Sequence, residues 1–101
     1  MSQPIYALVQ LTITNVEAFQ AEYGAHVLPH LQSFGGSVIS AGQPVRVVEG
    51  EYEHSNVVLL RFPDQESFDF WYSDPNYVAL KAKRAAYSDH DRTSLLLLKA
   101  S

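Results

Sequence analysis

The chain has 101 residues, of which 47% are hydrophobic, and its formal net charge at pH 7 is −4. These values predict one folded domain over residues 1–101 and argue against nucleic-acid binding, because phosphate contacts need a concentrated basic surface. The chain contains no cysteine, which excludes both disulfides and thiolate chemistry.

The first ten residues lack the basic start and apolar core of a signal peptide. No apolar run approaches the roughly 20 residues that span a bilayer. We therefore predict a cytoplasmic protein with no membrane partner. A domain of this size buries only about 60–65% of the surface of its unfolded chain, so association with a second copy would add stability.

Alternation and short apolar runs predict the strands. Residues 5–13 alternate, with one wholly apolar side, and residues 57–62 and 93–99 are runs rich in strand-forming side chains. Residues 37–41 and 45–48 are also strand-like and flank Gly42. We interpret this interruption as a bend within one long strand, the alternative being the tip of a hairpin.

Helical periodicity predicts a first helix from Asn15, its N-cap, to the Gly35-Gly36 pair. Its apolar side includes Phe19 and Tyr23. Pro29 lies inside this segment and is expected to kink it near residues 25–28, because proline cannot donate a backbone hydrogen bond.

Two shorter helices follow the third strand. Asp64 is predicted to cap a helix whose apolar stripe is Phe68, Trp71 and Tyr72, and Asp74 to cap the next one, with Pro75 at its first position. The second of these helices covers residues 76–87.

The resulting β-α-β-β-α-β order predicts a ferredoxin-like α+β domain, a four-stranded antiparallel sheet with its helices on one face. Polar side chains are scarce on both sides of the strands, since Val57 and Leu59 point one way and Val58 and Leu60 the other. The face without helices should therefore pack against the sheet of a second copy, which gives a homodimeric α/β barrel.

Several segments together resemble a known family: Gly35-Gly36, Gly42, Glu49-Gly50, the strand end at residues 61–63, residues 71–77 and Arg84. Over roughly residues 6–98 the chain resembles domain-of-unknown-function family 1330, small and mostly bacterial proteins of the dimeric α/β-barrel superfamily. The resemblance implies a homodimer whose two sheets close a barrel. The superfamily includes cofactor-free monooxygenases, isomerases, haem-dependent enzymes and ligand-binding proteins, so the fold leaves the function open.

His26 and His30 are the first candidate catalytic residues. At positions i and i+4 of a helix their rings can reach one point, and Glu22 could add a carboxylate, as in a metal site. No further ligand motif accompanies them, so we predict neither metal nor other cofactor. Either histidine could act as a general base, because imidazole titrates near neutral pH. The alternative is a hydrogen-bonded histidine at the edge of the core.

Arg84 shares a helix side with Tyr77 and Tyr87, so its guanidinium is expected to be partly buried and to need a partner. We predict an ion pair with Glu49, the alternative being a ligand carboxylate held by Arg84. Trp71, Tyr72 and Tyr77 belong either to the core or to the wall of a ligand pocket between helices and sheet.

Tyr6, on the first strand, could add a polar group to that pocket. The main functional hypothesis is a dimer that binds a small aromatic or polyketide-like molecule. Such a dimer could also have cofactor-free monooxygenase or isomerase activity. The alternatives are a non-catalytic ligand-binding or structural dimer and a metal or haem site, so the sequence leaves open whether the chain is an enzyme. A cavity lined by a histidine and an arginine would favour an enzyme.

Overall fold

The computed structural model describes residues 3–99, except for the side chain of His90. The ends of the predicted domain, residues 1, 2, 100 and 101, lie outside this range. Within it, four strands form one antiparallel sheet in the order β2-β3-β1-β4. The strands are β1 (Ile5–Leu11), β2 (Ser37–Gly42), β3 (Asn56–Phe62) and β4 (Ser94–Lys99). This order confirms the predicted ferredoxin-like fold.

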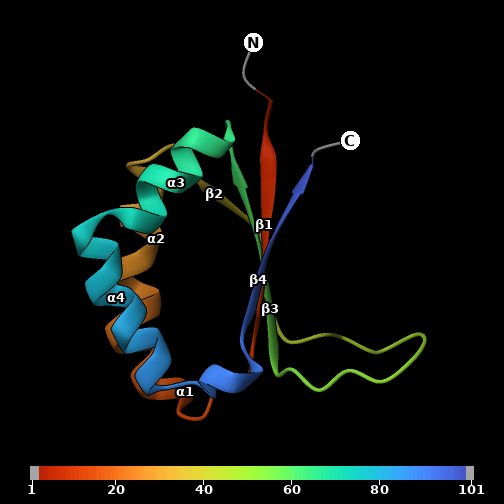
Figure 1. Cartoon of the computed structure of the whole chain (residues 1–101). Coiled ribbons are helices and arrows are strands. Elements are labelled where there is room, and N and C mark those ends of the chain that lie inside the picture. Colours follow the sequence, from red (N-terminus) through yellow and green to blue (C-terminus); the bar gives the residue numbers. More distant parts are fainter. Residues whose placement is uncertain (1–2, 100–101) are drawn as a thin grey trace.

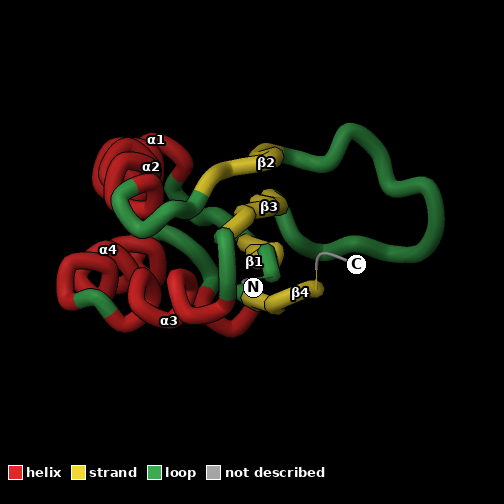
Figure 2. Tube along the Cα trace, turned by 90° about the horizontal axis from the view of Figure 1, so that it is seen from above, coloured by secondary structure: helices red, strands yellow, loops and turns green. Residues whose placement is uncertain are grey.

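The helices pack on one face of this sheet, as Figures 1 and 2 show. The first helical stretch consists of α1 (Val16–Phe19), a π-helical turn η1 (Gln20–Gly24) and α2 (Ala25–Gln32). After β3 come α3 (Gln65–Ser73) and α4 (Pro75–Ala86), and a short 3₁₀ turn η2 (His90–Arg92) leads into β4. No helix in the described range is long and apolar enough to cross a membrane.

Three side chains cap these helices where the sequence predicts caps. The Asn15 Oδ1 accepts from the Ala18 N–H at 3.1 Å, and the Asp64 Oδ1 accepts from the Ser67 N–H at 2.7 Å. The Asp74 Oδ2 accepts from the Asn76 N–H at 3.0 Å. Each bond satisfies an N–H group that the first turn of a helix leaves without an internal partner.

The irregularity expected at Pro29 lies earlier in the chain than predicted. The segment around Pro29 stays α-helical, and the preceding residues Gln20–Gly24 form the π-helical turn instead. There the Ala25 N–H donates to the Gln20 carbonyl, five residues back. A π-helical turn accommodates one extra residue and widens the helix locally.

The predicted strand over residues 45–48 is wrong. Residues 43–55 form a long loop that extends from the face of the sheet opposite the helices (Figures 1 and 2). Val45 and Val48 on this loop are exposed. These side chains favour strands, but pairing of β2 with β3 ends at Gly42, so residues 45–48 have no strand beside them.

The core lies between the helices and one side of the sheet. Its sheet side consists of Ala7, Val9, Leu11, Leu60 and Phe62, and its helix side of Phe19, Tyr23, Leu31, Phe68, Trp71 and Tyr77. On the other side of the strands Leu96 and Leu98 are exposed, and no described element covers them. The helices therefore cover only one of the two apolar faces.

Candidate functional site

A cavity of about 300 Å³ lies between the first helical stretch and the sheet. Its sheet side is formed by Val9, Leu11, Val38, Ala41, Val58 and Leu60. Its helix side is formed by Phe19, Gln20, Tyr23, Gly24, Val27, Leu28, Leu31, Trp71 and Tyr77. The π-helical turn contributes three of these residues, and such turns occur frequently at functional sites.

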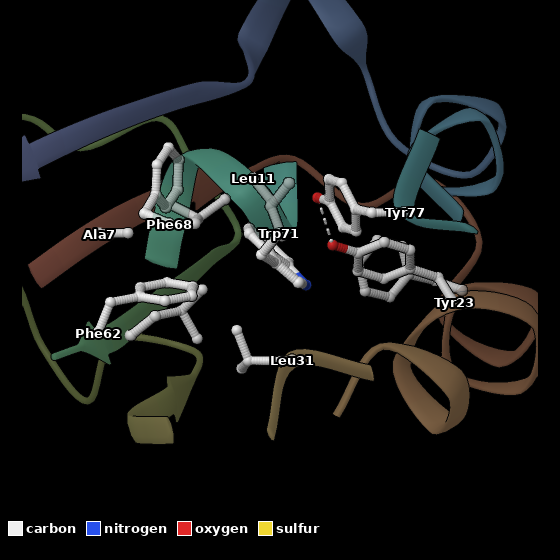
Figure 3. Close-up of a cluster of buried hydrophobic side chains, with 11 residues drawn as sticks. Ala7, Leu11, Tyr23, Leu31, Phe62, Phe68, Trp71 and Tyr77 are labelled. Atoms are coloured by element: carbon white, nitrogen blue, oxygen red, sulfur yellow. Dashed lines mark hydrogen bonds between the residues drawn. The ribbon is translucent and has the colours of Figure 1, made fainter. Parts of the chain in front are cut away.

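Aromatic rings form one wall of this cavity. The ring centroids of Trp71 and Tyr77 lie 4.0 Å apart, and those of Phe19 and Tyr23 lie 5.1 Å apart. Figure 3 shows Trp71 between Leu11 and Leu31, with the Tyr23 and Tyr77 rings beside it. Rings from η1, α3 and α4 meet here, so a flat apolar ligand would find stacking partners in the wall.

Two phenolic hydroxyls meet at this wall. The Tyr23 and Tyr77 oxygens are 3.0 Å apart and share a hydrogen bond (Figure 3). Burial raises the pKa of both Tyr23 and Tyr77, because an ionised phenol would lose its hydration there. Both hydroxyls therefore carry their protons at neutral pH.

Arg84 lies on the same network, with only 5% of its surface exposed. Its Nη1 donates to the Tyr77 hydroxyl at 3.2 Å, and Arg84 does not itself line the cavity. The predicted ion pair with Glu49 is wrong, because Glu49 is exposed on the loop of residues 43–55. No carboxylate among residues 3–99 forms an ion pair with Arg84.

The indole nitrogen of Trp71 is a second buried donor. Trp71 is 1% exposed, and its Nε1 has no hydrogen-bond partner among the described residues. In Figure 3 this nitrogen lies on the side of the ring that faces Tyr23. Since most buried polar groups in folded proteins are hydrogen-bonded, an unpaired donor at a cavity wall indicates a missing acceptor.

The family profile of the domain of unknown function DUF1330 matches residues 4–97. The chain belongs to the DUF1330 family. No curated protein matches the sequence.

Several solved structures have the same fold as this DUF1330 chain. A protein of unknown function from Rhodopseudomonas palustris is similar with a TM-score of 0.84 and 23% identity, covering 100% of this chain and 85% of the other. A dimeric ferredoxin-like protein of unknown function from Jannaschia sp. CCS1 is similar with a TM-score of 0.71 and 17% identity, covering 96% of this chain and 99% of the other. SnoaB, a cofactor-independent oxygenase from Streptomyces nogalater, is similar with a TM-score of 0.68 and 13% identity, covering 99% of this chain and 95% of the other.

The two candidate histidines of the DUF1330 chain, His26 and His30, lie in different environments. His26 is exposed, whereas His30 is partly buried and its Nε2 donates to the Asp74 Oδ2 at 2.9 Å. The His30 ring stacks on Tyr77 with centroids 6.3 Å apart, and its Nδ1 is buried without a described partner. Neither histidine lines the cavity, and residues 3–99 contain no group of three side chains that could hold a metal ion.

Tyr72 and Tyr6 also lie apart from the cavity. Burial acts to raise the pKa of Tyr72, but Lys81 and Arg84 outweigh it and the pKa is lowered. The Lys81 Nζ lies 4.6 Å from the centre of the Tyr72 ring. Tyr6 alternates with the buried Ala7 and so points to the side of the sheet away from the helices.

The structure therefore brings together Trp71 and Tyr77 at the cavity and places Arg84 one hydrogen bond away. Sequence reasoning missed Tyr23 as a site residue, since it has the spacing of an ordinary core position. It also missed the apolar lining from Leu31, Val38 and Ala41. Nothing in their residue types separates cavity-lining positions from filled core.

Proposed function

We propose that this protein binds a small, flat and largely apolar organic molecule, aromatic or polyketide-like, in the cavity between helices and sheet. The observation that carries the proposal is the 300 Å³ space with Phe19, Tyr23, Trp71 and Tyr77 in its wall. Small-molecule sites are typically apolar concavities of about 300–1,000 Å³ with a few polar groups that orient the ligand.

Binding has more support than catalysis. No histidine or arginine among the described residues lines the cavity, and His30 is already bonded to Asp74. Catalysis by a general base requires hydrogen-bond reach between the base and the reacting group.

A cofactor-free oxygenase or isomerase is the second candidate, favoured by the shared fold of SnoaB, which is described as a cofactor-independent oxygenase. In that case His30 would be the base, with Asp74 orienting its ring. An oxygenase would consume dioxygen when supplied with a hydroxylated aromatic substrate, whereas a binding protein would not.

We also propose that the binding protein is a homodimer, joined through the sheet face that carries Leu96 and Leu98. A neighbour of the same fold is described as dimeric. The loop of residues 43–55 and this face form an open groove of about 320 Å³, lined by apolar residues such as Leu8 and Val57 and by the charged Arg46, Glu49 and Glu51. A second copy would cover the apolar surface of this sheet face.

The binding proposal is tested by native mass spectrometry of freshly purified protein and by fluorescence titration with flat aromatic compounds. Trp71 is the only tryptophan, so its emission reports directly on the cavity wall. We expect Ala41→Phe to weaken binding strongly, because Ala41 lines the cavity from the exposed edge strand β2.

The matched control is Ala82→Phe, which adds the same ring at an exposed position of α4 outside the cavity. Binding should be unchanged in this variant. Equal affinity of the wild type and Ala41→Phe would show that ligands bind elsewhere and would contradict the proposal.

A further inference from the structure

The polar groups at the aromatic end of the cavity supply many more hydrogen-bond donors than acceptors. Arg84 has five N–H donors and no acceptor, and the Trp71 indole has one donor and no acceptor. Tyr23 and Tyr77 each add one O–H group. Among these four side chains, the only acceptors are the two phenolic oxygens, and the Tyr72 hydroxyl is one further phenolic partner of Arg84.

A count of protons shows that this cluster cannot satisfy itself. Arg84 donates to the Tyr77 oxygen, and a single proton links the Tyr77 and Tyr23 oxygens. Whichever tyrosine donates that proton, the O–H of the other has no hydrogen-bond acceptor among the described side chains. The Trp71 Nε1–H is a further unmatched donor. Leaving buried donors unpaired is unfavourable, so an acceptor is expected from outside the chain.

The positive charge of the buried Arg84 guanidinium also indicates an acceptor from outside the chain. Arg84 is buried and carries a positive charge without a carboxylate partner among the described residues. The carboxylates of the neighbouring helices are engaged elsewhere, Asp74 with His30 and Glu22 with Tyr87 and Lys83. An unpaired buried charge is costly, and an anion nearby would offset that cost.

We propose that the ligand carries a negatively charged oxygen, as in a planar aromatic carboxylate, phenolate or enolate, that accepts hydrogen bonds at the Tyr23, Tyr77 and Trp71 end of the cavity. Arg84 is a positioning residue that acts through the Tyr77 hydroxyl. The inference rests on the proposed binding function and adds the chemical class of the ligand. The apolar lining holds the flat body, and the donor cluster selects the anion.

Two probes of nearly identical shape test the inference, the anion 2-naphthoate and the neutral 2-naphthamide. Dissociation constants are measured by isothermal titration calorimetry on the full chain. We expect the wild type to prefer the anion by at least about tenfold, because hydrogen bonds to a charged acceptor are stronger than those to a neutral one.

Matched variants assign the preference to the cluster. Tyr23→Phe should reduce the anion-to-amide ratio while amide binding persists, and Tyr87→Phe, whose hydroxyl contacts Glu22 instead, should leave the ratio unchanged. Arg84→Gln should also reduce the ratio, whereas Arg92→Gln at an exposed site should not. A purely structural defect would weaken both probes alike. If Arg84→Gln does not fold, Tyr23→Phe still decides.

Equal binding of both probes to the wild type, or tighter binding of the amide, would overturn the inference and leave the binding function standing. A ratio unchanged by Tyr23→Phe would overturn it as well. Binding of neither probe would overturn the inference together with the proposed function.

Discussion

Asp74 performs two tasks with one carboxylate. It accepts from the Asn76 N–H as the N-cap of α4, and it accepts from His30 Nε2 across the helix layer. Its loss would therefore weaken both the start of α4 and the contact between α2 and α4. Tyr77 lies in the first turn of α4 and stacks on His30. Asp74 therefore also fixes the position of the aromatic wall of the cavity.

The hydrogen bond from His30 lowers the pKa of Asp74 below its ordinary value of 3.8, although desolvation acts in the opposite direction. A carboxyl whose pKa is lower in the folded than in the unfolded state stabilises the fold above its ordinary pKa. That contribution is lost as the pH falls from about 4 through the folded-state pKa. We expect Asp74→Asn to flatten the dependence of stability on pH between about 3 and 5.

Urea denaturation midpoints measured across this pH range check the expectation. Some dependence should persist in Asp74→Asn, because the hydrogen bond from Tyr87 likewise lowers the pKa of Glu22. Asp69→Asn, at an exposed position of α3, is the control and should follow the wild type. Parallel curves for the wild type and Asp74→Asn would show that the His30 contact contributes nothing to acid stability.

At the scale of elements, Gly36 fixes how β2 follows the first helical stretch. Gly36 is buried, and a Cβ added there would lie 2.5 Å from the Leu31 Cδ1 and 2.9 Å from the Phe62 Cε2. Both neighbours are fully buried core side chains, so neither can move aside freely. Gly36→Ala should therefore destabilise the protein by about 1–3 kcal/mol through overpacking.

The comparison variant is Gly24→Ala, where the closest atom to the added Cβ is the end of the flexible Gln20 side chain. Gly24 belongs to a helical turn, so alanine should be neutral or stabilising by up to about 1 kcal/mol. Free energies of unfolding in urea compare the two. A Gly36→Ala variant as stable as the wild type would show that the β2 connection is looser than this packing indicates.

Local signals in the sequence were sufficient for most elements. Asn15, Asp64 and Asp74 cap helices as predicted, because an N-cap depends on the few residues that follow it. The strand predicted over residues 45–48 is wrong because a strand needs a neighbouring strand to pair with. No local sequence pattern shows that the pairing of β2 ends at Gly42. The π-helical turn over Gln20–Gly24, which carries the buried Tyr23, was likewise not predicted.

The candidate site was predicted only in part for the same reason. Trp71 and Tyr77 could be named because aromatic side chains commonly form either a core or the wall of a ligand pocket, and both line the cavity. The cavity itself depends on how far η1 and α2 lie from β2, where the pairing register shifts between Val38 and Ser40. The residue types that line this space do not reveal the distance between the elements, so the cavity could not be predicted from the sequence.

At the scale of the whole molecule, the sheet has one covered and one open apolar side (Figure 2). The open side includes Leu96, which is 50% exposed in the single chain and lies opposite Leu8 in the β1–β4 pairing. Monomeric proteins rarely leave a large contiguous apolar surface in water. Stable protein interfaces bury roughly 1,200–2,000 Å² in total, and one face of a four-stranded sheet can supply its half of such an area.

We therefore expect the wild type to be a dimer at micromolar concentration and Leu96→Lys to be a monomer, because pairing would bury an unpaired ammonium group. Val78→Lys is the matched control, since Val78 is 54% exposed but lies on α4 in the helix layer. Its dimer should persist. Analytical ultracentrifugation distinguishes the species, and circular dichroism confirms that each variant is folded. If the wild type sediments as a monomer, the face carrying Leu96 is open to water and the sheet-to-sheet dimer is wrong.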